Sequence, residues 1–264
     1  MAELRLVRAA EHMNVIRLLR SGILGPAIFS ALGLIAAQPA ERNGINLARF
    51  DVSKLPREMV SEYLSPMEFR MLGFTKKGWI VLWDKDTRTE TDSGCYVEMH
   101  VLNLTNDSDI DSVNSESCEI SEEKRQRFID RWQPKLSASS SLERFPLYAE
   151  GDKLIAEVRV RKEMEGEFDE YYGDVWLVSK ERGEKKIGTI SDRRSNPNFA
   201  EIIGFIRSPL EDRIAVVVGF PSRTHGSTKL DLIAYQVIGV HLGVGFLSPH
   251  NKSLKPTNPA QGDR

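Results

Sequence analysis

The sequence predicts a mostly β protein, built as an antiparallel sandwich or as propeller-like sheets with two short helices. About nine segments have the alternating or continuously apolar pattern of strands, and turn residues separate them. Two segments instead have the 3.6-residue periodicity of helices. Because most strands follow one another without an intervening helix, antiparallel pairing is expected.

Residues 1–40 have the three regions of a secretory signal peptide. Arg17 and Arg20 form a short basic segment, an apolar stretch covers 23–37, and small residues follow it. The apolar stretch is shorter than the roughly twenty residues of a membrane-spanning helix. We expect cleavage and a periplasmic or secreted protein without a stable membrane span; the alternative is an uncleaved membrane anchor.

The remaining chain divides into four regions by composition. We expect an N-terminal β-rich half with short helices at 41–136 and a serine-rich linker at 137–142. A C-terminal β half follows at 143–246. The region 247–264 is rich in proline and polar residues, which predicts a disordered tail.

Both expected helices begin at a recognisable N-terminal signal. In 55–64, Pro56 suits a first helical turn, and the apolar residues after it fall on one stripe. In 121–132, Ser121 can cap the N-terminus, and Pro134 follows the end.

The strands expected in the first half are 68–74, 79–85 and 95–104. Gly78 supplies the turn between the first two, which therefore form a hairpin. In 95–104 apolar and polar residues alternate, so one face of this strand packs on a core. The second half contains six more expected strands: 153–162, 174–180, 185–191, 201–206, 213–220 and 229–240.

Three stretches resemble motifs of a family of predicted secreted bacterial proteins. These are GFTKKGWIVLW, DSGCYVEMHVLNL and RSPLEDRIAVVV, within 69–104 and 200–238. The last also resembles the strand repeat of TolB-like propeller blades. The chain differs in having Lys77-Gly78 where the family has Asp-Gly, and in containing Cys95. The resemblance implies export and a β fold, and it implies no activity.

The charge of the chain limits its expected partners, and its two cysteines predict a disulfide. The formal net charge is −2 at pH 7 and no basic run follows the leader, so nucleic acid is not an expected partner. The two cysteines, Cys95 and Cys118, are expected to form a disulfide in an oxidising compartment. It would stabilise the fold by roughly 3 kcal/mol. The alternative is two separate buried thiols.

The best candidate for a metal site is the motif Asp107, Asp109 and Asp111. Alternating carboxylates in a loop can converge on Ca²⁺. Ser112 stands where an EF-hand loop requires glycine, so this is not an EF-hand. The alternative is a solvated acidic loop, and no other cofactor is expected.

No residue is predicted to be catalytic. His225 and His100 could serve an exported hydrolase if one of them met a distant carboxylate, but no G-x-S-x-G nucleophile elbow is present. The sequence therefore favours an envelope binding or structural module without catalysis, whose partner is a ligand or another envelope protein. The alternatives are that hydrolase and a calcium-stabilised module.

Overall fold

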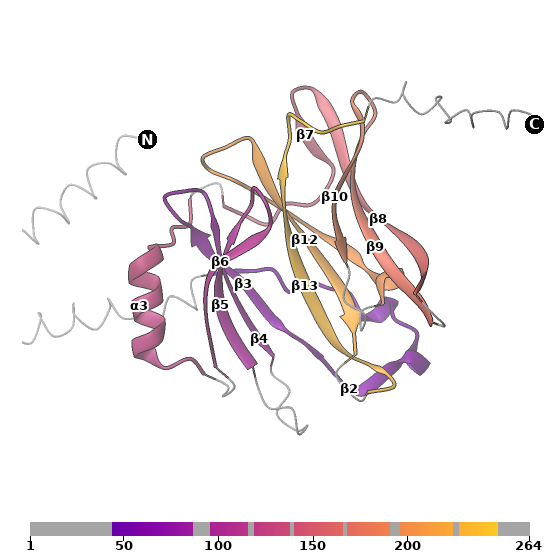
Figure 1. Cartoon of the computed structure of the whole chain (residues 1–264), viewed down its shortest axis with the longest axis horizontal. Helices are drawn as coiled ribbons and strands as arrows, with labels where there is room; N and C mark the ends of the chain where they lie inside the picture. Colours follow the sequence, from indigo (N-terminus) through magenta and orange to yellow (C-terminus); the bar gives the residue numbers. More distant parts are fainter. Residues whose placement is uncertain are drawn as a thin grey trace, which may run out of the picture. The chain divides into compact units, whose positions relative to one another are not determined.

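The structure is a computed structural model, and its described residues form three β-sheets that pack face to face and one α-helix on the outside (Figure 1). The described residues from Gly44 to Leu247 form one compact unit. The prediction of a mostly β, largely antiparallel protein is confirmed. The residues that the structure describes are 44–86, 96–115, 119–137, 140–165, 168–190, 196–223 and 227–247.

The first sheet is antiparallel, with strand order β1-β3-β4-β5-β6. The predicted hairpin is confirmed, and Gly78 has a φ of +78° in its turn, a conformation that glycine adopts without steric cost. The five strands are β1 (Ile45–Asn46), β3 (Glu68–Phe74), β4 (Ile80–Asp86), β5 (Tyr96–Asn103) and β6 (Ser108–Ser115).

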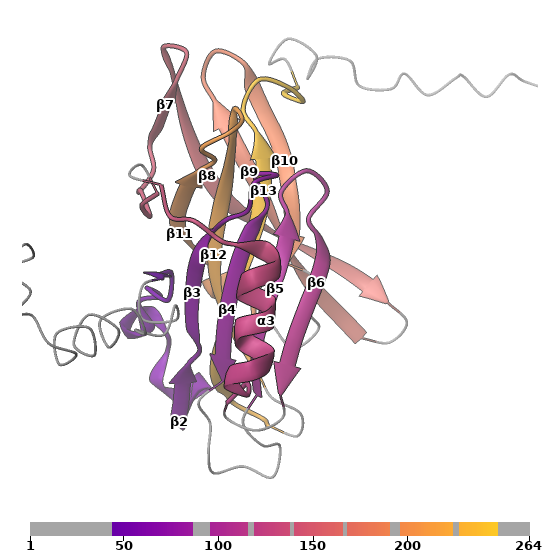
Figure 2. The ribbon, with the colours of Figure 1, turned by 90° about the vertical axis from the view of Figure 1, so that its left-hand side faces the viewer.

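Helix α3 (Glu122–Trp132) covers the outer face of the first sheet, as Figure 2 shows. The Ser121 hydroxyl accepts a hydrogen bond from the backbone N of Lys124 (3.4 Å), so the predicted cap is present. Phe128 is buried against the sheet, and Trp132 packs beside it. The predicted helix at 121–132 is confirmed. Within the described residues, no helix is long and apolar enough to cross a membrane.

The central sheet has the order β11-β12-β13-β2. Every residue of β12 after Arg213 is buried, because the first sheet covers one face of the central sheet and the third sheet covers the other. The chain passes from β2 to β3 at Met67, whose backbone N donates to Ile233 O (3.4 Å) and so links the two sheets. The strands are β2 (Val60–Pro66), β11 (Glu201–Arg207), β12 (Arg213–Ser222) and β13 (Leu230–His241).

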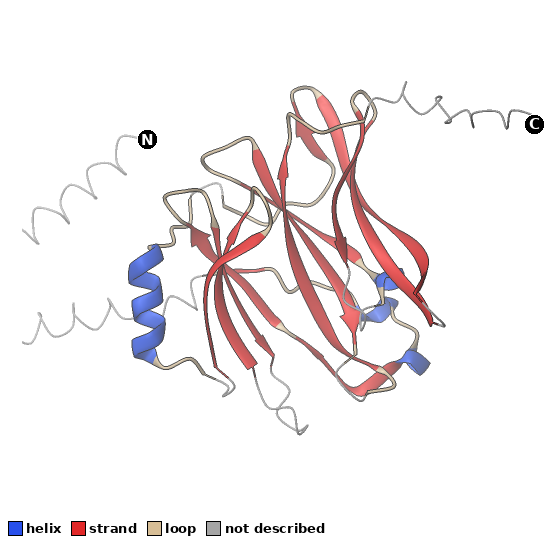
Figure 3. Ribbon diagram, in the orientation of Figure 1, coloured by secondary structure: helices blue, strands red, loops and turns tan. Residues whose placement is uncertain are grey.

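The predicted helix at 55–64 is wrong. Only a single 3₁₀ turn, η3 (Arg57–Met59), forms there, and β2 follows it directly (Figure 3). Strand β2 pairs in parallel with β13, so its backbone groups bond to a distant strand. Tyr63, expected on the apolar stripe, is 66 % exposed. Pairing with the edge of a sheet here outweighs a helical pattern that is too short to be stable by itself.

The third sheet is antiparallel, with the order β10-β9-β8-β7. Its inner face packs on the central sheet through Leu154, Val175 and Leu177, all fully buried. The predicted strands of this region are confirmed, with longer bounds for the hairpin of β8 and β9. The strands are β7 (Leu147–Ala149), β8 (Asp152–Glu165), β9 (Phe168–Ser179) and β10 (Gly183–Ile190), and the 3₁₀ helix η4 (Pro197–Phe199) follows them.

The segment after α3 runs along two sheets and is tied to both. Lys135 exchanges two backbone hydrogen bonds with Phe74 of the first sheet (2.9 and 3.0 Å). Glu143 does the same with Phe205 of the central sheet (2.9 and 2.8 Å). Both ends of the predicted linker region are therefore held by sheet-like pairing. This pairing places residues 142–145 beside the edge of β11.

Candidate functional site

Several of the predicted features lie outside the described residues. These are the signal peptide at 1–40, both cysteines of the expected disulfide (Cys95 and Cys118) and His225. Of the expected tail at 247–264, only Leu247 is described, and it pairs with Glu184 of β10. Export, the disulfide and a role for His225 stay predictions.

The structure does not bring together the three aspartates of the predicted calcium motif. Asp107 lies in the turn before β6 with a φ of +53°, and Asp109 and Asp111 lie on β6. Each carboxylate has its own partners. Asp107 accepts a hydrogen bond from Gly239 N (2.7 Å), and Asp109 lies 3.2 Å from His100 Nδ1. Asp111 accepts from Arg131 Nη1 (2.7 Å) and Trp132 Nε1 (2.8 Å).

A bulge in β6 explains why these side chains diverge. Val101 pairs with Asp111 and the next residue of β5, Leu102, pairs with Asp109, so Ile110 is an extra residue in the ladder. Such a bulge turns the residues on either side of it to opposite faces of the sheet. Asp109 thus meets a histidine of β5, whereas Asp111 meets α3. Nowhere in the described residues do three or more His, Cys, Asp or Glu side chains form a group that could hold a metal ion.

His100 belongs to a cluster of polar side chains with Asp84, Tyr96 and Glu98. The cluster lies on the face of the first sheet that points toward the central sheet. Tyr96 Oη donates to Glu98 Oε2 (2.9 Å) in this cluster. Burial is the main cause that raises the pKa of Tyr96 to about 12, and the hydrogen bond to Glu98 and the negative charge of Glu98 add to it. Burial also raises the pKa of Asp84 to about 6, although the nearby His100 opposes the rise.

In this cluster neither ring nitrogen of His100 is open to a substrate. A general base needs a ring nitrogen within reach of a substrate or of a nucleophile. His100 directs Nδ1 to Asp109, and its Nε2 is buried without a hydrogen-bond partner. The imidazole is thus joined to a carboxylate, as the hydrolase hypothesis requires, but its second nitrogen is enclosed. We interpret the cluster as a buried polar network of the fold.

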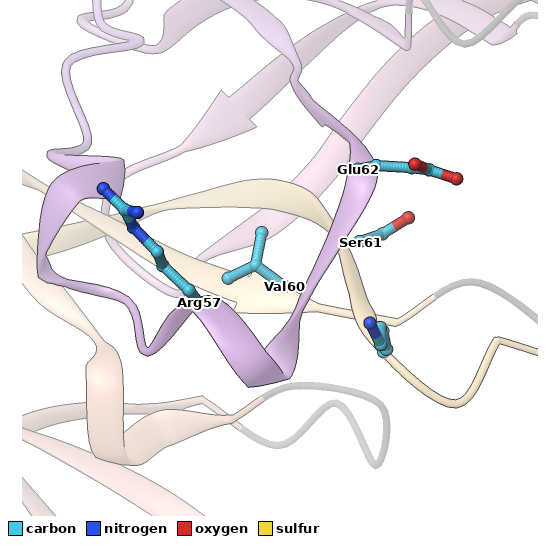
Figure 4. A pocket seen from close by; sticks show the side chains of 5 residues that line it. Arg57, Val60, Ser61 and Glu62 are labelled. Carbon is cyan, nitrogen blue, oxygen red and sulfur yellow. The ribbon is translucent and has the colours of Figure 1, made fainter.

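A surface recess lies beside β2 and the start of β13, with a volume of about 490 Å³ (Figure 4). Arg57 and Glu62 point away from each other on either side of Val60 (Figure 4). Val60 is the one apolar lining residue, and none of the five lining residues is buried; the other two are Ser61 and Lys229.

A second cavity, of about 370 Å³, lies at the edge of the central sheet beside β11 and is called the β11 cavity below. Five of its ten lining residues are apolar and are called its floor below, and the five charged ones are called its rim. Leu142 and Ile203 belong to the core between the first and central sheets, and Phe145, Ala156 and Ile202 belong to the core between the central and third sheets. The floor therefore lies where both hydrophobic cores reach the surface.

The rim of the β11 cavity is charged, and both of its carboxylates are engaged. Lys54 Nζ lies 2.6 Å from Glu201 Oε1, and this hydrogen bond raises the pKa of Lys54. Asp51 accepts from the hydroxyl (2.6 Å) and the backbone N (3.1 Å) of Ser53, which lowers the pKa of Asp51. These two groups keep their charges at neutral pH.

Two arginines complete the rim. Arg49 lies between β1 and the 3₁₀ helix η2 (Val52–Lys54), and Arg144 lies in the segment that pairs with β11. Both side chains are exposed. Within the described parts of the chain, neither has a hydrogen bond or an ion pair. Sequence reasoning missed this site because its residues come from segments that are far apart in the chain and carry no local motif.

Comparison of the chain with protein-family profiles, with curated proteins and with solved structures found no match. The resemblance to secreted bacterial proteins and to propeller blades therefore stays a prediction.

Proposed function

We propose that this chain is an exported binding module of the periplasm or cell envelope, and that it holds a small molecule in the β11 cavity. The observation that carries the proposal is an apolar floor beneath a charged rim. A volume of about 370 Å³ lies within the range of small-molecule sites. Apolar floors with a few polar groups around them are typical of such sites, because the floor provides affinity and the polar groups orient the ligand.

The charged groups of the rim favour binding over catalysis. An acid–base catalyst needs a group whose pKa lies near the working pH. The pKa of Asp51 is lowered and that of Lys54 is raised, so both move away from neutrality. The other two cations of the rim are arginines, which do not release a proton at physiological pH. These four groups can therefore orient a ligand, and they are not suited to transfer protons.

The neutral fluorescent probe N-phenyl-1-naphthylamine tests the cavity. We expect its fluorescence to rise on binding and to saturate at a single site per protein. Leu142→Trp, which puts a larger side chain into the floor from a loop, should weaken binding about tenfold or more. Ser61→Trp, which fills the recess of Figure 4 instead, is the matched control and should leave binding unchanged. Binding that is indifferent to Leu142→Trp would contradict the proposal.

Export has its own test. We expect intact-mass spectrometry of the protein from periplasmic or extracellular fractions of its host to show an N-terminus near Gln38 or Glu41. The mass before reduction should be two hydrogens lower than after it, if Cys95 and Cys118 are joined. Full-length reduced protein in the cytosolic fraction would contradict export and the disulfide together.

A further inference from the structure

The β11 cavity has an excess of positive charge at its mouth. The rim carries three cations (Arg49, Lys54 and Arg144) and two carboxylates (Asp51 and Glu201). Glu201 is paired with Lys54, and Asp51 accepts hydrogen bonds from Ser53 and keeps its charge, so three cations against two carboxylates leave a net charge of +1. Arg49 and Arg144, called the rim arginines below, line the cavity and have no ion pair among the described residues.

The acidic side chain next to Arg144 is paired with another residue. The residue before Arg144 is Glu143. Its carboxylate accepts a hydrogen bond from Arg207 Nε (3.2 Å) and is therefore paired with a residue of the central sheet. The charge of Arg144 also opposes the rise in the pKa of Lys54, so these two cations repel each other across the rim. A bound anion would relieve this repulsion.

The arginines on the outer face of the third sheet, in contrast, are paired with carboxylates. On the outer face of the third sheet, Arg159 lies 2.9 Å from a carboxylate oxygen of Glu184, and Arg161 lies 3.0 Å from Asp174. These arginines sit in a network of ion pairs that satisfies them. The rim arginines have no such network among the described residues, although they line a cavity to which five apolar residues also contribute.

We propose that the ligand of the β11 cavity is an amphipathic anion: an apolar ring or chain that carries one carboxylate, phosphate or sulfonate group. This inference rests on the proposed binding function. The apolar body would lie on the floor formed by Phe145, Ile202 and their neighbours. The anionic group would lie at the mouth, where the planar fork of a guanidinium group can donate two parallel hydrogen bonds to it.

A matched pair of probes separates this inference from the proposed function. N-phenyl-1-naphthylamine is neutral, and 8-anilino-1-naphthalenesulfonate has the same aromatic skeleton with a sulfonate added. We expect the native protein to bind the sulfonate about tenfold or more tightly than the neutral probe. That preference should shrink as salt rises from about 0.05 to about 0.5 M, because salt screens exposed charges.

The double variant Arg49→Gln/Arg144→Gln should bring the two affinities close to parity and leave the neutral probe bound as before. Retained binding of the neutral probe shows that the variant is folded and that its cavity is intact. The matched control is Arg57→Gln/Arg127→Gln, which removes the same charge from exposed positions outside the β11 cavity and should preserve the preference.

The outcomes of this experiment are distinct. If both probes bind equally, or if the double variant keeps the preference for the sulfonate, the inference about the anion is overturned while the cavity remains a binding site. If neither probe binds, or if Leu142→Trp affects neither, the proposed function itself fails.

Discussion

Gly239→Ala is expected to lower the free energy of unfolding by about 3 kcal/mol or more, because it forces two sheets apart. A Cβ added at Gly239 would lie 2.0 Å from the carbonyl oxygen of Leu104 and 2.5 Å from its carbonyl carbon. Both are backbone atoms, so no side-chain rotation can relieve the clash. The backbone N of Gly239 also donates to Asp107 Oδ1 (2.7 Å), which fixes the approach of the first sheet to the central sheet.

Denaturation in urea, followed by tryptophan fluorescence, measures this effect. Gly243→Ala is the matched control, since its added Cβ would meet only the side chain of His241, at 3.4 Å or more, and that of Asp212. We expect the control to change the stability by less than about 1 kcal/mol. Equal stabilities for the two variants would contradict the close packing of the first and central sheets.

Asp84→Asn is expected to stabilise the protein above pH 6 and to have little effect near pH 4. The cross-strand neighbours of Asp84 are Phe69 on β3 and Glu98 on β5, and Phe69 stacks on Tyr235 (ring centroids 5.4 Å apart). A carboxyl group between an aromatic pair and a second carboxylate is costly to ionise. Burial is the main reason that the pKa of Asp84 rises from 3.8 to about 6.

The sign of the pH dependence follows from linkage. Between about pH 4 and pH 6 the folded protein keeps the proton on Asp84 and the unfolded chain has lost it, so stability falls as the pH rises. The loss is complete above pH 6 and is on the order of 3 kcal/mol. Asparagine carries no charge at any of these pH values, so the variant lacks this loss.

Urea denaturation of the native protein and of Asp84→Asn from pH 4 to pH 8 measures the difference directly. We expect the variant's advantage to grow from near zero to about 2 kcal/mol or more across this range. Asp212→Asn, at an exposed position, is the control and should show no such trend. An advantage for Asp84→Asn that is independent of pH would show that folding does not raise the pKa of Asp84.

Much of the fold follows from local patterns in the sequence. The hairpin around Gly78, the capped helix from Ser121 and the strands of the second half all have a periodicity that reflects which face is buried. The same reasoning missed β6, whose sequence SDIDSVNS has no apolar alternation. Strand β6 pairs with β5 at the edge of the first sheet through backbone groups, and these are the same for every sequence.

The sequence by itself determined the β composition, most strand positions, helix α3 and the expectation of export, because each depends on neighbouring residues. The tertiary structure decided which distant strands pair. That pairing made β2 a strand instead of a helix, and it introduced the bulge that separates Asp109 from Asp111. It also brought Arg49 and Arg144 to one cavity. Such contacts depend on the free energy of packing and pairing between remote segments, which no local pattern encodes.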